Sequence, residues 1–182
     1  MAVTKIPHKR TPRKDLSAKY VRSIFNYDKK TGRLVWKERN NVSPHINSRD
    51  QGKLAGWIEP KGYRAIEINS RAYKSHRIAR LYVTGKWPKD QIDHINGVKA
   101  DNSWKNLREA TNKQNCRNQG PRKNNVSGYK GVNWRKRNQK WVALISDYPK
   151  RVHLGFFKTA KEAHEAYERA IKKVYGKFAF HG

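Results

Sequence analysis

The chain has 182 residues, of which 42 are Lys or Arg and 14 are Asp or Glu, so its formal net charge is +28. A compact fold with this imbalance repels itself unless a polyanion is nearby, so nucleic acid is the expected partner, ahead of an anionic membrane surface or an acidic protein. The single cysteine, Cys116, excludes an intrachain disulfide and a cysteine-based zinc site. We expect no membrane span, because no apolar run approaches ~18 residues, and no signal peptide, because no apolar stretch follows the basic N-terminus. The cysteine usage fits a reducing compartment, so we expect a cytoplasmic location.

The N-terminal third begins with a basic segment and continues with apolar periodicity. Residues 1–14 are rich in Lys, Arg and Pro with little to bury, which predicts a flexible basic arm. Residues 16–27 carry apolar side chains at helical spacing and predict a helix. A short strand is predicted over residues 34–36, after a Thr-Gly turn signal.

The next segment reads as strands followed by a short helix. Two strands are predicted within residues 52–69, broken at residues 60–62 by a Pro-Lys-Gly turn. A helix is predicted over residues 76–83, and Gly85 and Pro88 stop it.

A change in composition at residues 118–128 predicts a flexible linker, because Val126 is its only apolar member. We therefore expect a domain at 15–118, a linker at 119–128 and a second domain at 129–182. Deleting residues 129–182 is then expected to leave the first domain's site intact.

The segment IDHING at residues 92–97 places a carboxylate and an imidazole at the end of a predicted strand. Asp93 and His94 end an apolar strand directly before an Asn-Gly turn. Asn106 begins a second short strand, and a capping box at Thr111 predicts a helix that carries Asn115. A hairpin packed on that helix can bring the acid, the imidazole and the amide of Asn115 to one point.

These side chains suit phosphodiester hydrolysis. Carboxylate and amide oxygens bind a hard cation that polarises the phosphate. A neutral imidazole can deprotonate the attacking water, and a further group must orient that imidazole. A lone Asp-His pair is more often a surface hydrogen bond, so the inference depends on the full ordered pattern.

That pattern resembles the HNH endonucleases, in the zinc-free branch that includes phage intron-encoded nicking homing endonucleases. The resemblance covers residues 16–118 and rests on SHRIAR (75–80), IDHING (92–97) and NLREAT (106–111). It implies a ββα-metal fold in which Asp93 and Asn115 bind one Mg²⁺ or Mn²⁺. It further implies that His94 is the general base and that Asn106 orients its loop and ring.

Four polar residues lie near this pattern, and two of them, His76 and Arg108, have two possible roles each. His76 either supports the site or touches a phosphate, or it is a structural helix-start histidine. Arg108 either clamps the cleaved phosphate through its planar fork or pairs near Glu109 or with solvent. Asn96 and Asn102 are expected to be turn residues.

The C-terminal region alternates apolar and polar residues with the period of a half-buried antiparallel sheet. A capping box at Thr159 and Glu162 then opens a helix that Gly176 ends, and this helix is expected to cover one sheet face. The inward side chains are expected to be Val132, Trp134, Trp141, Ala143, Ile145, Val152 and Leu154.

This region resembles the plant ethylene-response-factor (APETALA-type) DNA-binding domain over residues 128–181. The matching segments are GYKGV (128–132), KWVA (140–143), RVHLGFF (151–157) and TAKEA (159–163). The resemblance implies DNA contacts from Asn133, Arg135, Arg137, Leu144, Ser146, Arg151 and His153.

The chain departs from the plant members at several of these positions. Plant members have Arg at positions 133 and 146, Glu at 144 and Trp at 153, so the docking mode carries over but the target sequence does not. The alternative is that Arg135 and Arg151 only solubilise the sheet.

The expected protein is thus α+β: an HNH ββα-metal domain followed by a three-stranded antiparallel sheet packed on one helix. We expect a monomeric, phage-encoded, homing-type endonuclease that nicks or cuts double-stranded DNA. The alternatives are a non-catalytic DNA-binding regulator with a degenerate nuclease fold, and an RNA-cleaving enzyme, which B-form docking of the sheet disfavours.

Overall fold

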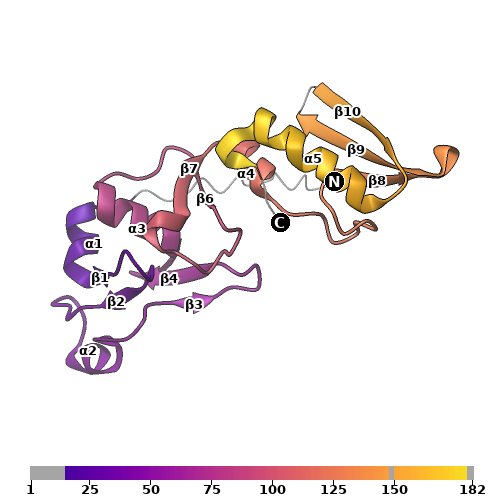
Figure 1. Ribbon diagram of the computed structural model, residues 1–182. Coiled ribbons are helices and arrows are strands. Elements are labelled where there is room, and N and C mark those ends of the chain that lie inside the picture. The colour runs from indigo at the N-terminus through magenta and orange to yellow at the C-terminus, as the bar shows by residue number, and fades with distance from the viewer. Residues whose placement is uncertain (1–14, 148–149, 180–182) are drawn as a thin grey trace, which may run out of the picture. The chain divides into compact units, whose positions relative to one another are not determined.

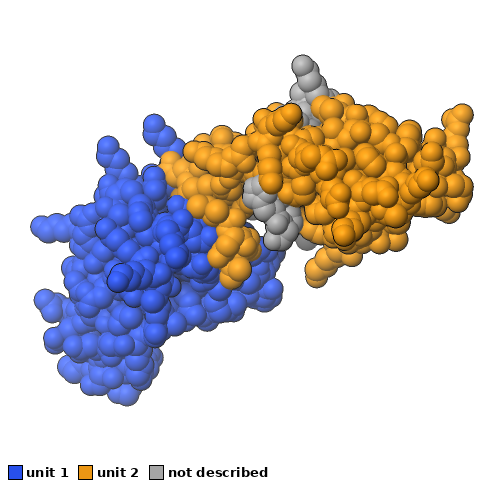
Figure 2. Space-filling model, in the orientation of Figure 1, with its two compact units in different colours: residues 1–89, 99–107 blue, residues 90–98, 108–182 orange. Residues whose placement is uncertain are grey.

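The computed structural model describes residues 15–147 and 150–179, and the predicted basic arm at 1–14 lies outside this part. Helices and strands are mixed along the chain, which confirms the α+β class (Figure 1). The chain divides into two compact units (Figure 2). The first runs to Lys89 and takes in Lys99–Leu107, whereas the second is Asp90–Val98 together with the chain from Arg108 onward.

This division differs from the boundary expected at residues 119–128. The strand and helix of the expected nuclease site belong to the same unit as the C-terminal sheet. The reason is that α4 (Asn112–Asn118) packs against β6 (Gln91–His94) and also against η3 (Gly176–Phe178), the 3-10 turn after the last helix. The candidate site is therefore built partly by the C-terminal end of the chain.

The first unit is a set of short elements around two small sheets. Strands β1 and β2 pair antiparallel, and β3, β4 and β5 form an antiparallel sheet in that order. In chain order the elements are α1 (Ala18–Ile24), β1 (Phe25–Tyr27), β2 (Leu34–Trp36), α2 (Pro44–Asp50), β3 (Trp57–Ile58), β4 (Arg64–Ile68), β5 (Arg71–Lys74), α3 (Ser75–Thr84) and η1 (Trp104–Asn106).

Two helix ends in this unit can be compared with those predicted from the sequence. The helix expected over 16–27 ends at Ile24, because Phe25 is extended and pairs with Trp36. Helix α3 ends at Gly85 as predicted, and the φ of this glycine, 76°, is one that residues with a side chain rarely adopt.

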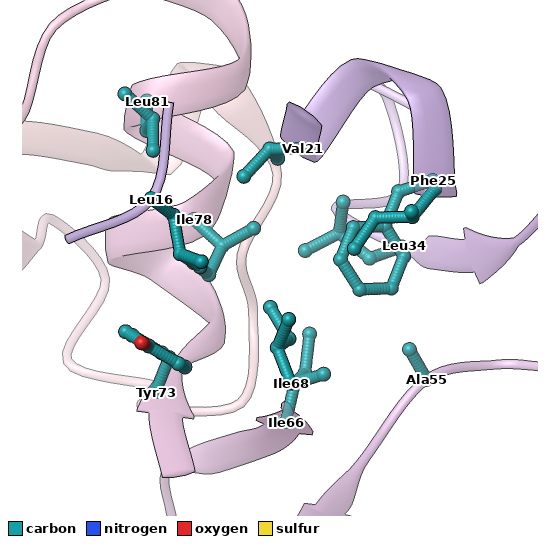
Figure 3. Close-up of a cluster of buried hydrophobic side chains, with 11 residues drawn as sticks. Leu16, Val21, Phe25, Leu34, Ala55, Ile66, Ile68, Tyr73, Ile78 and Leu81 are labelled. Carbon is teal, nitrogen blue, oxygen red and sulfur yellow. The ribbon is translucent and has the colours of Figure 1, made fainter. Parts of the chain in front are cut away.

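The core of the first unit joins α1, α3 and four strands through apolar side chains (Figure 3). Trp87 donates from its indole nitrogen to the carbonyl of Leu16 (3.0 Å), which ties the start of the described chain to this core. Burial of this surface stabilises the unit by about 25 cal/mol for each Å² of apolar area. The cluster consists of Leu16, Val21, Ile24, Phe25, Leu34, Ala55, Ile66, Ile68, Tyr73, Ile78 and Leu81.

The second unit combines a hairpin-plus-helix with a sheet-plus-helix. The hairpin is β6 and β7 (Leu107–Ala110), which pair with each other, and α4 follows it; we call these three elements the ββα motif. The rest is the C-terminal domain: β8 (Val132–Arg135), η2 (Lys136–Asn138), β9 (Lys140–Asp147), β10 (Lys150–Phe157), α5 (Ala160–Tyr175) and η3.

Helix α5 covers one face of the antiparallel sheet β8-β9-β10, as the sequence predicted. The core between them contains Val132, Ala143 and Ile145 from the sheet and Tyr167 and Ile171 from α5. No helix in the part of the chain that the structure describes is long and apolar enough to cross a membrane.

Two local devices shape this packing. A Cβ atom at Gly131 would lie 2.2 Å from the Tyr167 ring, so only glycine lets the backbone come this close to α5. The hydroxyl of Thr159 accepts from the Glu162 backbone N–H (3.1 Å), but the Glu162 carboxylate accepts from Lys158 N–H (3.2 Å). In the predicted capping box the Glu162 carboxylate would accept from the backbone N–H of Thr159. Here it accepts from the N–H of the preceding residue instead.

Candidate functional site

Asp93 and His94 are both buried at the end of β6, each only 4% exposed. The predicted Asn-Gly turn follows at once: the backbone N–H of Gly97 donates to the carbonyl of His94 (2.9 Å). The side chain of Asn96 accepts from the N–H of Val98 (2.9 Å), so Asn96 is a turn residue as expected. A carboxylate and an imidazole are thus both buried on consecutive residues where the strand ends.

Asn118, on the last turn of α4, is a site residue that the sequence reasoning missed. Its amide nitrogen donates to Asp93 Oδ1 (3.0 Å) and to the carbonyl of His94 (2.8 Å). The residue is only 5% exposed. Asn118 follows Asn115 by three positions, which puts both on one helix face; that spacing was the available signal.

Asn115 lies on α4 in a different hydrogen bond. The predicted capping box is complete, with Thr111 and Gln114 bonded reciprocally, so α4 begins where the sequence placed it. The amide nitrogen of Asn115 donates to the side-chain oxygen of Gln91. The amide that reaches Asp93 is therefore that of Asn118, while Asn115 is held at the start of β6.

Arg108 on β7 pairs with the candidate metal ligand. Its guanidinium Nε and Nη2 atoms each lie 2.7 Å from Asp93 Oδ2. The same guanidinium donates to the carbonyl of Lys177 and lies 4.0 Å from the centre of the Phe178 ring. Neither of the two sequence readings of Arg108 named this partner.

Asn106 and His76 belong to the first unit. Asn106 is buried and donates from its amide nitrogen to the carbonyl of Asp101 (2.8 Å). His76 is buried at the start of α3, with its ring 5.5 Å from that of Tyr63. Asn102 is also buried, and its carbonyl accepts from the hydroxyl of Tyr27 (2.7 Å). The contacts of Asn106 and Asn102 order the chain on both sides of Ser103.

The donor types of the ββα motif fit a hard divalent cation. Within residues 15–147 and 150–179, no three His, Cys, Asp or Glu side chains gather to form a metal cluster. Mg²⁺ keeps several waters and takes one or two carboxylates together with substrate phosphate oxygens, so it needs few protein ligands. Asp93 with an amide oxygen from α4 meets that need, but a cation at Oδ2 must compete with Arg108.

Lys130, in the C-terminal domain, caps the C-terminal end of α4. Its ammonium lies 2.6 Å from the carbonyl of Arg117 and also within hydrogen-bond distance of the carbonyls of Cys116 and Gln119. Burial lowers the pKa of Lys130 to about 8. A cation at the C-terminal end of a helix satisfies otherwise unpaired carbonyls and complements the helix dipole.

The sheet face turned away from α5 carries the predicted DNA-contacting side chains. Strand register places Arg151 opposite Ser146 and His153 opposite Leu144, so these four share one face. Asn133 pairs with Val142 on the same face. We call this surface the reading face; Arg135 also lies on it, and Arg137 follows on the exposed turn η2.

The exposures of three apolar side chains differ from what their positions suggest. Trp134 and Val152 lie on the inward side by register, as expected, but are 40% and 44% exposed. Val142 lies on the reading face but is only 1% exposed. A bulge between His153 and Gly155 shifts the alternation, so Phe156 falls opposite Val142 on the reading face. Phe156, which is 43% exposed, therefore adds an apolar side chain to the reading face that can contact thymine methyl groups.

A buried Asp and a buried His on a ββα motif, joined in one unit to a basic sheet backed by one helix, point to a nuclease-type fold that carries its own nucleic-acid-binding domain. Residues 73–117 match the family model of the HNH endonucleases, and residues 127–177 match that of the AP2 domain. These matches confirm the two resemblances. The chain carries a segment of the HNH endonuclease family and an AP2 domain, which indicates a nuclease that binds DNA.

The chain also resembles a phage protein over a short segment. Protein 3.8 of Escherichia phage T7 is 38% identical over 55 residues, which cover 30% of this chain and 46% of that protein. The chain thus matches less than half the length of this relative. No solved structure matches the chain.

Arg151→Ala tests the reading face. We expect a loss of about 1–3 kcal/mol in binding to the preferred duplex, if the guanidinium contacts a guanine edge, and little change on a scrambled duplex. The preferred duplex is recovered by selection from a random library, and affinity is measured at fixed salt. The matched control is Arg169→Ala on the exposed side of α5. Equal losses on both duplexes would assign Arg151 to phosphate contact or solubility alone.

Proposed function

We propose that this protein is a metal-dependent, homing-type endonuclease that hydrolyses phosphodiester bonds of double-stranded DNA. Its AP2 domain directs it to its target. His94 is the general base, Asp93 and Asn115 bind one Mg²⁺ or Mn²⁺, and Asn106 orients the His94 loop. We further propose a phage origin, for which the phage relative is the support, and action in the cytoplasm of a bacterial host.

The observation that carries this proposal is the pair of buried side chains at the end of β6. Burying a carboxylate and an imidazole costs free energy unless both have partners. Asp93 receives hydrogen bonds from Asn118 and Arg108, which fix the orientation of its carboxylate. Such an arrangement is typical of a catalytic site and uncommon in a surface hydrogen bond.

The chain's own residues account for the protein side of the chemistry. A bound divalent cation supplies the charge that polarises the phosphate and stabilises the leaving oxygen. His94 removes a proton from the attacking water, and the hydrogen bond from Asn118 to its carbonyl fixes its backbone. Arg108 offers a planar fork suited to a phosphate oxygen once it leaves Asp93.

The ion pair between Arg108 and Asp93 favours a second candidate function. Because it engages one oxygen of the expected metal ligand, it also suits a non-catalytic DNA-binding regulator that keeps a nuclease fold. The two candidates differ in whether the protein breaks any phosphodiester bond.

Supercoiled plasmid incubated with purified protein decides between them. We expect conversion to the nicked form in Mg²⁺ or Mn²⁺, none in EDTA, and loss of activity in Asp93→Ala, because a hard cation with too few oxygen ligands binds weakly. The matched control is Asp90→Ala, an exposed acid directly before β6. Plasmid that stays intact with every metal, but is still bound, would leave the regulator as the function; full cleavage in EDTA would exclude the metal mechanism.

A further inference from the structure

Three contacts join the ββα motif to the C-terminal domain inside the second unit. In the first, the ammonium of Lys130 reaches three carbonyls at the end of α4, the nearest at Gln119 and Arg117. Lys130 lies one residue before Gly131, where the chain enters β8 against Tyr167. The end of α4 is thus bonded to the first strand region of the sheet domain.

The second contact runs from the sheet to α4 through a tyrosine. The hydroxyl of Tyr175 donates to the carbonyl of Ser146, a residue of the reading face (3.3 Å). The guanidinium of Arg117 lies 4.8 Å from the centre of the Tyr175 ring, within the range of a cation–π interaction. Arg117 precedes Asn118, which holds Asp93. Successive contacts therefore lead from the reading face to the candidate catalytic pair.

The third contact reaches Asp93 itself. Phe178, which is 6% exposed, packs under the guanidinium of Arg108, and the carbonyl of Lys177 accepts from the same group. Arg108 then pairs with Asp93. The side chain of Arg108 is only 14% exposed, so the C-terminal turn shields this ion pair from water.

A groove of about 1210 Å³ is lined by residues of both the ββα motif and the C-terminal domain. Its lining includes Lys113 and Cys116 of α4 together with Asn133, Leu144 and Arg151 of the reading face. DNA that contacts the reading face in this unit therefore meets the exposed side of α4.

We propose that Lys130, Tyr175 and Phe178 form a clamp that fixes the ββα motif on the AP2 domain, so that cleavage occurs at a set number of base pairs from the recognised sequence. The three are positioning residues, and their role in cut placement rests on the proposed nuclease function. The clamp replaces the flexible tether that the composition of residues 119–128 suggests.

The two arrangements differ measurably in where the cut falls. A flexible tether of about 10 residues has an end-to-end distance of roughly 17 Å, on a scale of about 5–6 Å times the square root of the length. At about 3.4 Å per base pair, this range corresponds to about five neighbouring positions. A clamped motif confines cleavage to about one or two neighbouring positions.

The experiment maps cut positions at nucleotide resolution on a duplex that carries the footprinted site, using the full chain. Four residues, Gly-Ser-Gly-Ser, are inserted after Gly120, where the chain is exposed. We expect the insertion alone to leave the cut position unchanged, because the clamp and not the tether sets the distance. Lys130→Met with the insertion should spread the cuts over several phosphates while the footprint stays the same.

A control variant and a second measurement, amide hydrogen exchange, accompany the mapping of cut positions. The exchange measurement does not depend on catalysis. Lys161→Met removes the same charge from an exposed position of α5 and should leave the cuts unchanged. Amide hydrogen exchange of α4 should rise at least tenfold in Lys130→Met and in the milder Phe178→Leu, but not in Lys161→Met. A shifted cut after insertion alone, or unchanged exchange of α4 in both variants, would overturn the clamp. A wild-type protein that does not cut, but shows the exchange difference, refutes the nuclease and not the clamp.

Discussion

His94→Ala is expected to lower the cleavage rate by a factor on the order of 10²–10⁴ while DNA affinity stays at the wild-type value. The imidazole is the group that takes the proton from water in the proposed reaction, whereas affinity comes from basic side chains elsewhere. The backbone carbonyl that accepts from Asn118 is retained in alanine, so the end of β6 keeps its attachment to α4. The measurement is single-turnover nicking at saturating protein, with binding followed in EDTA.

The matched control for this variant is His45→Ala, an exposed histidine on α2. It should cut at the wild-type rate. Thermal unfolding of both variants shows whether the buried position affects the fold. Wild-type cleavage by His94→Ala would remove the general base from the mechanism.

Deletion of residues 129–182 is expected to abolish cleavage on every duplex, which is the opposite of what the sequence alone suggested. The deletion removes Lys130 from the end of α4 and Phe178 from Arg108. Loss of a buried phenylalanine alone costs about 3–5 kcal/mol in a packed core, a large share of the roughly 5–15 kcal/mol that stabilises a domain. The ββα motif should therefore lose its order in the fragment.

The comparison uses plasmid nicking by full-length protein, by the fragment 1–128 and by a chain lacking residues 1–14. The chain without its basic segment should keep its cut site but bind all DNA more weakly, with a flatter salt dependence. If the fragment 1–128 cuts as fast as the full chain with reduced selectivity, the two domains are independent and the contacts to α4 are dispensable.

Much of the candidate site was predictable because its signals are local. The Asn-Gly turn after His94 and the capping box at Thr111 depend on residues within four positions of each other, and both formed as predicted. The order of Asp93, His94, Asn106 and Asn115 carried the family resemblance, which the match at residues 73–117 confirmed.

In the C-terminal sheet, local sequence patterns predicted only part of the arrangement. Alternation with a period of two predicted which face α5 covers, and Val132, Ala143 and Ile145 are buried there. It did not predict the bulge at Gly155, which moves Phe156 to the reading face. A single extra residue reverses every later assignment along a strand, and nothing in the pattern itself marks its position.

The sequence by itself determined the class of chemistry and the identity of the main catalytic candidates, because residue type and spacing set those. Only the tertiary structure decided what holds them: Asn118 on Asp93, Arg108 between Asp93 and Lys177, and Lys130 on the end of α4. Arg108 and Lys177 are 69 positions apart. A buried polar group takes whichever partner the packing of distant segments brings within about 3 Å, so no local pattern can name that partner.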